Sequence, residues 1–195
     1  MNALFLALPL ALLSATAQAT VINIDAREFG FAFPTDPAPE VGQLITPITN
    51  PPGGPLLQLT LEPGTYVIRN ATGMSGADPN FIGWNYSSGW VWSVVVSDAA
   101  TNQVVYYADR GGVQGTQASI AAQPDVQSFQ DTFVLTQATT LNFMIRDYYL
   151  PDNAGGVAVD VSLISSVPDA PTPALLALGL AAMGLRLRGR GRLKA

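Results

Sequence analysis

The 195-residue sequence contains no cysteine and no histidine, and these two absences exclude several kinds of chemistry. Without cysteine the fold has no disulfide and depends on its core for stability. Ser-His-Asp and Cys-His catalysis are excluded, and so are ordinary zinc sites, which use imidazole or thiolate ligands. The remaining functional groups are carboxylates, hydroxyls and amides, so a bound metal would be a hard, oxygen-coordinated cation.

Basic residues are also scarce, and most of them lie close to the C-terminus. Of nine Lys and Arg residues, five occur between positions 186 and 194. The segment 20–168 has four arginines against thirteen acidic residues, which leaves it with a net charge of −9. Because a surface of this sign repels phosphate backbones, the sequence predicts no nucleic-acid partner.

Residues 1–19 have the pattern of a secretory signal peptide. An apolar run, Leu4–Leu13, precedes Ala17-Gln18-Ala19, which matches the small-x-small pattern of a cleavage site. A strand-like alternation begins directly afterwards at Thr20. The sequence therefore predicts an exported protein whose folded body begins at residue 20.

Residues 167–195 form a distinct tail, with prolines first, then the apolar run Ala174–Leu185, then a basic cluster. As a helix this run would be about 18 Å long, against about 30 Å for the hydrocarbon core of a bilayer. The basic cluster would stay on the cytoplasmic side. In this order of parts the tail resembles the sorting signal of bacterial PEP-CTERM proteins, the substrates of exosortases. Pro171-Thr172-Pro173 departs from the family pattern, which has glutamate in the middle.

The resemblance implies transient membrane insertion of the precursor and processing of the tail by an exosortase-type enzyme. The body would then be released or attached to the cell envelope. A plain C-terminal membrane anchor is the alternative, which the short apolar run disfavours. The resemblance assigns the sorting signal to two prolines and four arginines: Pro171, Pro173, Arg186, Arg188, Arg190 and Arg192.

Residues 20–166 are predicted to form one all-β domain. Apolar and polar residues alternate with period two in short runs separated by turn residues, and no long helical period appears. The clearest runs are 57–61, 65–70, 90–96, 103–109, 141–146 and 157–163. We predict an antiparallel β-sandwich of seven or eight strands, of jelly-roll type. The proline-rich segment 33–55 and the glycine-rich segment 110–116 are predicted to be surface loops.

The segment RDYYLPDNAGGVAVDVSL, residues 146–163, is the most suggestive of a binding site. Asp147, Asp152 and Asn153 offer oxygen ligands of the kind that Ca²⁺ accepts in irregular geometry. Locally the loop also resembles the Asp-Asn-x-Gly loop of calcium-dependent lectins and jelly-roll carbohydrate modules. The alternative is a tight turn without a metal, which the residue types favour because Asn and Gly accept positive φ.

Aromatic side chains are the second kind of candidate, because sugar rings stack on them. Trp90 and Trp92 alternate with Val91 and Ser93 and are predicted to face the core. Two further aromatic residues lie in a predicted loop, NFIGWNYSSG, and two lie beside the acidic segment. The predicted exposed platforms for a ligand are therefore Trp84, Tyr86, Tyr148 and Tyr149.

Together these patterns predict a non-catalytic, exported β-sandwich protein of a bacterial cell envelope or extracellular matrix. One alternative is a carbohydrate-binding module for extracellular polysaccharide, assisted by calcium. The other is a glycosidase, which needs two carboxylates at a set separation. Asp25 with Glu28, or Asp109 with Asp147, would be the pair, and the spacing selects neither.

Overall fold

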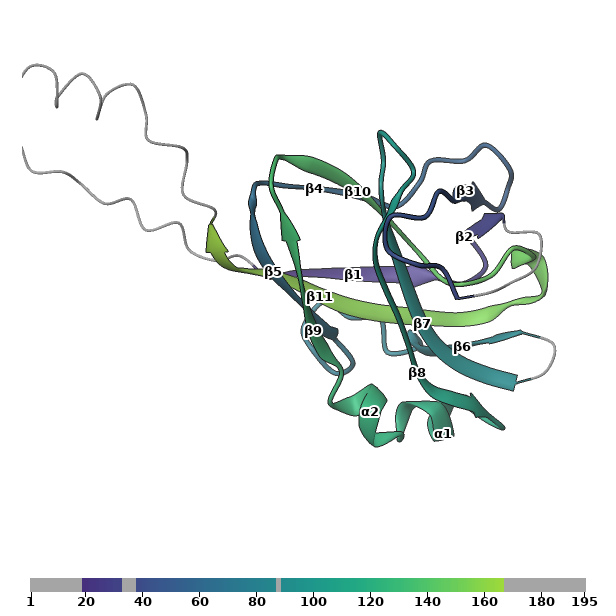
Figure 1. Cartoon of the computed structure of the whole chain (residues 1–195). Helices are drawn as coiled ribbons and strands as arrows, with labels where there is room; N and C mark the ends of the chain where they lie inside the picture. Colours follow the sequence, from purple (N-terminus) through teal and green to yellow (C-terminus); the bar gives the residue numbers. More distant parts are fainter. Residues whose placement is uncertain (1–18, 33–37, 87–88, 167–195) are drawn as a thin grey trace, which may run out of the picture.

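Several strands form where the sequence alternates, and every pair of neighbouring strands is antiparallel. The computed structural model describes residues 19–32, 38–86 and 89–166 (Figure 1). Two short helices, α1 (Gln117–Ala121) and α2 (Pro124–Gln127), and a 3₁₀ turn, η1 (Leu150–Asp152), accompany the strands. The strands of this part of the chain are β1 (Thr20–Asp25), β2 (Phe29–Ala32), β3 (Thr46–Thr49), β4 (Gln58–Leu61), β5 (Gly64–Asn70), β6 (Ile82–Tyr86), β7 (Gly89–Asp98), β8 (Val104–Gln114), β9 (Gln130–Leu135), β10 (Thr139–Met144) and β11 (Ala154–Ser166).

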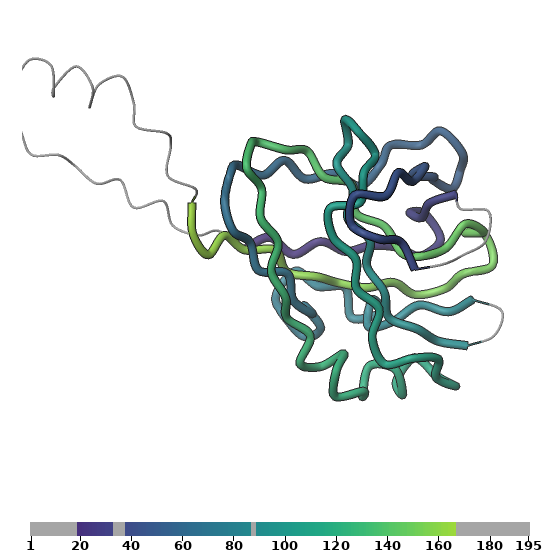
Figure 2. Tube along the Cα trace, viewed as in Figure 1, coloured from purple at the N-terminus to yellow at the C-terminus, as the bar shows by residue number. Residues whose placement is uncertain are grey.

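Two groups of strands enclose the core, and β6 connects them. In the first group β11 pairs with β1 and β5, and β5 pairs with β9. In the second group β7 pairs with β8 and β10, and β10 pairs with β4. Strand β6 pairs with both β11 and β7, so the hydrogen bonding continues from one group into the other. Figure 2 shows the path of the chain through both groups. The predicted antiparallel all-β sandwich is confirmed, but the described residues form eleven strands, where the sequence predicted seven or eight.

The main core lies on the face of β7 that the sequence predicted. Trp92, Val94 and Val96 are fully buried there and pack with residues of the other group such as Ile24 and Ile68. Trp90 is partly buried against the same cluster. Alternation alone identified this face, because successive side chains of a strand point to opposite sides.

The opposite face of β7 is also buried, which the sequence did not predict. Val95 belongs to a second apolar cluster with Phe31 of β2, Ile45, Val104 and Met144. The pair β2–β3 forms a small second sheet over this cluster.

Strand β3 shows that the predicted loop over 33–55 is wrong for residues 46–49. Pro47 pairs with Phe31 in the two-stranded sheet. Proline is tolerated there because β3 is an edge strand, in which its missing N–H costs no hydrogen bond in the ladder. Burial of Phe31 and Ile45 stabilises this arrangement against an extended surface loop.

The predicted loop over 110–116 is also wrong for most of its length, because β8 continues to Gln114. The register shifts between the pairs Trp92↔Arg110 and Trp90↔Gln114. Gly111 and Gly112 have φ angles of 74° and 58°. These glycines therefore make a bulge within the strand, a use of glycine that resembles a loop in the sequence.

The described chain begins and ends at the same end of the sandwich (Figure 1). Thr20 of β1 pairs with Val161, close to the end of β11 at Ser166. At about 3.3 Å per residue, the thirteen residues of β11 span about 40 Å. The start of β11 at Ala154 therefore lies far from both ends. No helix among the described residues is long and apolar enough to cross a membrane. The predicted sorting tail, and the predicted signal peptide except its last residue, lie outside the described residues.

Candidate functional site

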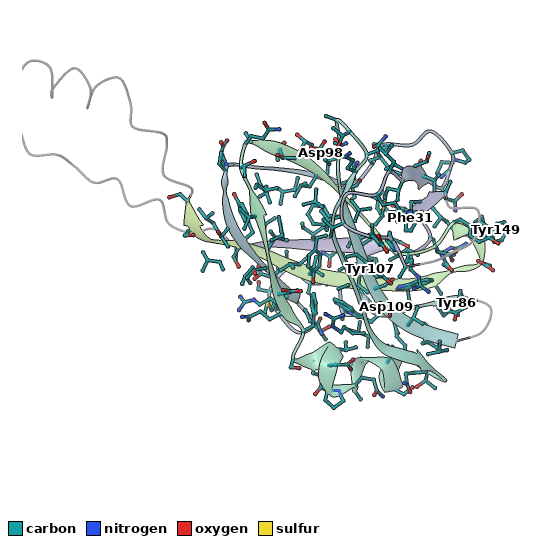
Figure 3. The ribbon with its side chains drawn as sticks, in the orientation of Figure 1. Phe31, Tyr86, Asp98, Tyr107, Asp109 and Tyr149 are labelled. Atoms are coloured by element: carbon teal, nitrogen blue, oxygen red, sulfur yellow. The ribbon has the colours of Figure 1, made fainter. Side chains whose placement is uncertain are left out.

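Tyr148 and Tyr149 line a groove of about 440 Å³ at the start of β11. Residues 148–151 form one wall, and residues 47–50, 52–54 and 56 form the other. The tyrosine side chains are 58% and 57% exposed, which confirms the exposure that the sequence predicted. Figure 3 shows Tyr149 at the end of the molecule opposite the two ends of the described chain.

The tyrosine wall is held by a turn that Asp147 caps. Its carboxylate Oδ1 accepts hydrogen bonds from the backbone N–H groups of Tyr148 and Tyr149, at 2.6 and 3.2 Å. Its carbonyl oxygen accepts the N–H of Phe31 at 2.9 Å, which ties the turn to β2. Leu150, only 2% exposed, anchors η1 in the main core. The two tyrosines are therefore presented outward from a fixed backbone.

The opposite wall is a turn held by hydrogen bonds within itself and by one to the residue before β2. The hydroxyl of Thr49 donates to the carbonyl of Pro51 at 3.0 Å, and Gly54 N–H donates to the same oxygen at 3.2 Å. The N–H of Asn50 donates to the carbonyl of Glu28 at 3.0 Å. This wall was not predicted, because the proline-rich composition of residues 33–55 is also that of a surface loop. The Pro-Pro-Gly-Gly stretch at 51–54 was the available signal of a defined turn.

The three residues predicted to bind calcium have different surroundings. Asp147 caps its own turn, and Asp152 is exposed at the end of η1. Asn153 is 3% exposed, and its Nδ2 donates to the carbonyl of Ala26 at 3.0 Å, which holds the start of β11 against the end of β1. Among the described residues no group of three or more acidic, His or Cys side chains could hold a metal. These contacts are those of a structural turn, and calcium binding stays a prediction.

The predicted exposure of Trp84 is wrong. Trp84 lies in β6, is 3% exposed, and donates its indole N–H to the hydroxyl of Ser93 at 3.2 Å. It is buried because β6 pairs with both β7 and β11, so that one of its faces lies against the core. Tyr86 is partly buried, with its ring 5.9 Å from that of Trp84. Neither residue lines the groove of Tyr148 and Tyr149.

Trp84 and Tyr86 instead line a small cavity with Asp109, Arg146 and Asp147. Arg146 forms an ion pair with Asp109 at 3.1 Å, and Tyr107 donates its hydroxyl hydrogen to Asp109 at 3.1 Å. Figure 3 shows Tyr86, Tyr107 and Asp109 in this region. The structure thus brings Asp109 and Asp147 to one cavity, but its volume is about 30 Å³. That space suits about one water molecule, so a sugar ring does not fit between these two carboxylates.

Tyr107 should make the protein less stable at alkaline pH. Burial raises its pKa to about 12, and the negative charge of Asp109 adds to the shift. Because the pKa in the folded state lies above the ordinary value of 10, the contribution is complete below pH 10 and is lost as the pH rises towards 12. We expect the unfolding free energy of the parent to fall more steeply than that of Tyr107→Phe between pH 10 and 11.5. Urea unfolding of both proteins across this range tests the prediction, and parallel curves would contradict it.

Comparison with known proteins assigns no family to the chain. No protein-family model matches it, and no curated protein does so. Among solved structures, an antigen and type I fimbria protein of Burkholderia pseudomallei is aligned over 75% of this chain and 96% of its own, at 12% identity and a TM-score of 0.21. A similarity of this size carries no conclusion about fold or function.

Proposed function

We propose that the protein is an exported, non-catalytic β-sandwich protein of a bacterial cell envelope or extracellular matrix, and that it binds polysaccharide in the groove of Tyr148 and Tyr149. The main support for binding in this groove is the pair of tyrosines. Each is more than half exposed, and both are held on a capped turn beside a groove of about 440 Å³. Ligand sites have volumes of about 300–1,000 Å³ and are lined mainly by apolar and aromatic groups with a few polar ones. A jelly-roll arrangement of the sandwich belongs to this proposal.

The position of the groove supports a display function. The groove lies at the start of β11, whereas β11 ends at Ser166, immediately before the predicted sorting tail. A protein held in the envelope through this tail would present the groove on its outer side, about 40 Å from the point of attachment.

Export and sorting rest on the terminal sequence patterns. An exosortase-type enzyme is the proposed processing partner, and the precursor would be inserted in the membrane through residues 174–185.

We expect simultaneous replacement of Arg186, Arg188, Arg190 and Arg192 with glutamine to impair membrane retention and processing of the tail, because basic charge resists translocation. Immunoblots of membrane and medium fractions measure this effect. Processing identical to that of the parent would exclude this function of the tail.

The groove proposal predicts that Tyr148→Ala and Tyr149→Ala each weaken glycan binding about fivefold, equivalent to about 1 kcal/mol of lost stacking. Because both side chains are exposed, the unfolding free energy should change by about 0.5 kcal/mol or less. An oligosaccharide selected on a glycan array serves as the ligand for titration calorimetry. Val134→Ala is the control, because Val134 is 58% exposed on β9 and does not line the groove. Equal affinities of all four proteins would refute the groove as the site.

Two further measurements separate the alternatives for this function. Titration with millimolar Ca²⁺ and then with a chelator distinguishes a calcium-assisted module from a metal-independent one, and Asp152→Ala should abolish only a calcium-dependent component. A glycosidase would release reducing sugar from the bound polysaccharide.

A further inference from the structure

We infer that the groove of Tyr148 and Tyr149 selects uncharged polysaccharide, with its affinity set by ring stacking and neutral hydrogen bonds. This inference rests on the proposed function of the groove as a carbohydrate site and adds the class of ligand that the site accepts.

The lining of the groove has no charged side chain among the described residues. It consists of aromatic, aliphatic, proline and glycine residues together with the hydroxyl and amide side chains of Thr49 and Asn50. The hydroxyl of Thr49 is already bonded to the carbonyl of Pro51. The polar groups that a ligand would meet are therefore phenol hydroxyls, one amide, backbone groups and the Thr49 oxygen, which can still accept a hydrogen bond. These match the hydroxyl groups of a neutral sugar and offer no ionic partner to a carboxylate or sulfate.

The charges next to the groove are acidic. Asp147 precedes the tyrosine wall, and Asp152, which is exposed, directly follows it. The arginine closest in sequence, Arg146, forms an ion pair with Asp109 at 3.1 Å. An anionic polysaccharide in the groove would lose hydration without gaining an ionic contact, and it would be repelled by the net charge of −9 of the body.

None of the other arginines in the described part of the chain lines the groove, so none supplies a positive charge to a bound anionic polymer. Arg69 is bonded to Asp160 at 2.8 Å, and the guanidinium of Arg110 lies over the ring of Phe129, 5.4 Å from its centroid. Arg27 is exposed, but it does not line the groove and it adjoins the acidic Glu28. A cationic polymer would be attracted to the acidic body in general, without needing the tyrosines. Binding of that kind weakens steeply with salt because exposed charges are screened. Salt dependence and tyrosine dependence therefore distinguish the two classes of ligand.

The test uses the full-length chain in a mild uncharged detergent, with a neutral glucan, a polyuronate and a glucosamine polymer as probes. Binding is measured at about 20 mM and about 500 mM NaCl for the parent, Tyr148→Ala/Tyr149→Ala and Asp152→Lys. We expect the glucan to bind with little salt dependence and to lose about tenfold or more in affinity in the double tyrosine variant. The polyuronate should bind at least about tenfold more weakly than the glucan. Asp152→Lys should improve its binding and leave that of the glucan unchanged.

The outcomes separate this inference from the function on which it rests. The selectivity would be overturned if the polyuronate or the glucosamine polymer bound as tightly as the glucan and lost this binding in the tyrosine variant. The groove would then remain a carbohydrate site. Binding of all three polymers that the tyrosine variant leaves unchanged, or no binding of any, would overturn both.

Discussion

Replacing Trp92 with alanine is expected to lower the free energy of unfolding by about 3 to 5 kcal/mol, the usual cost of truncating a buried aromatic residue. Trp92 is 0% exposed, and its ring centroid lies 4.6 Å from that of Phe129. Since domains are stable by only about 5–15 kcal/mol, the variant would be close to unfolding at room temperature. Urea unfolding followed by far-UV circular dichroism measures the loss. A loss below about 1 kcal/mol would contradict the placement of this residue in the core.

Trp92→Phe separates lost packing from lost hydrogen bonding. The indole Nε1 of Trp92 is buried without a partner among the described residues. Phenylalanine retains an aromatic contact with Phe129 and removes this unpaired donor, so its cost should be smaller than that of alanine. Val134→Ala is the surface control, with an expected change of about 0.5 kcal/mol or less.

The second large effect is expected for Arg69→Ala. Asp160 is 1% exposed, and its Oδ2 accepts the Nε–H of Arg69 at 2.8 Å and the hydroxyl of Ser162 at 3.2 Å. Removing the guanidinium leaves a buried carboxylate without its ionic partner, which costs about 3–5 kcal/mol for fully buried pairs. Because the Arg69 side chain is 41% exposed, we expect a loss of about 3 kcal/mol, and a fall in melting temperature of about 6–12 °C.

Two matched variants test the origin of this loss. Arg27→Ala removes an exposed arginine and should change stability by about 0.5 kcal/mol or less. The double variant Arg69→Met/Asp160→Leu removes both charges and should recover most of the stability, because apolar replacements of an ion pair are often neutral or stabilising. A double variant as unstable as Arg69→Ala would show that packing around Arg69, and not the unpaired charge, causes the loss.

The strands with one clear apolar face were predictable because their signal is local. Alternation identified β1, β5, β7, β10 and β11, and it placed Trp92 in the core. Turn residues were equally informative. Asp98 begins the turn between β7 and β8, where its Oδ1 accepts hydrogen bonds from the N–H groups of Ala100 and Thr101 at 2.7 and 3.0 Å. Asn102 ends this turn with a φ angle of 58°.

The features that the sequence did not predict depend on contacts between distant segments. The burial of Trp84 depends on β6 lying between β7 and β11, and β11 begins about seventy residues later in the chain. Strand β3 forms although it contains Pro47, because β2 and the second apolar cluster lie beside it. Neither arrangement leaves a periodic pattern in the segment concerned.

Only one wall of the candidate site was predicted from the sequence. Tyr148 and Tyr149 were predicted as ligand contacts because they are large aromatic residues next to turn residues. Both tyrosines line the groove. The opposite wall was missed because its residues, 47–56, carry no chemistry that distinguishes a binding surface from a proline-rich loop. The calcium prediction relied on residue type, whereas the structure gives Asn153 a structural hydrogen bond to Ala26.

The most direct test of the groove as the ligand site is a two-dimensional ¹H–¹⁵N NMR titration of the protein with a neutral oligosaccharide. We expect chemical shift changes to cluster in the non-proline residues of 47–56 and 148–151, at the end of the sandwich opposite Thr20 and Ser166. Changes centred on Trp84, Asp109 and Arg146, or spread over β9 and β4, would place the ligand elsewhere and contradict the account.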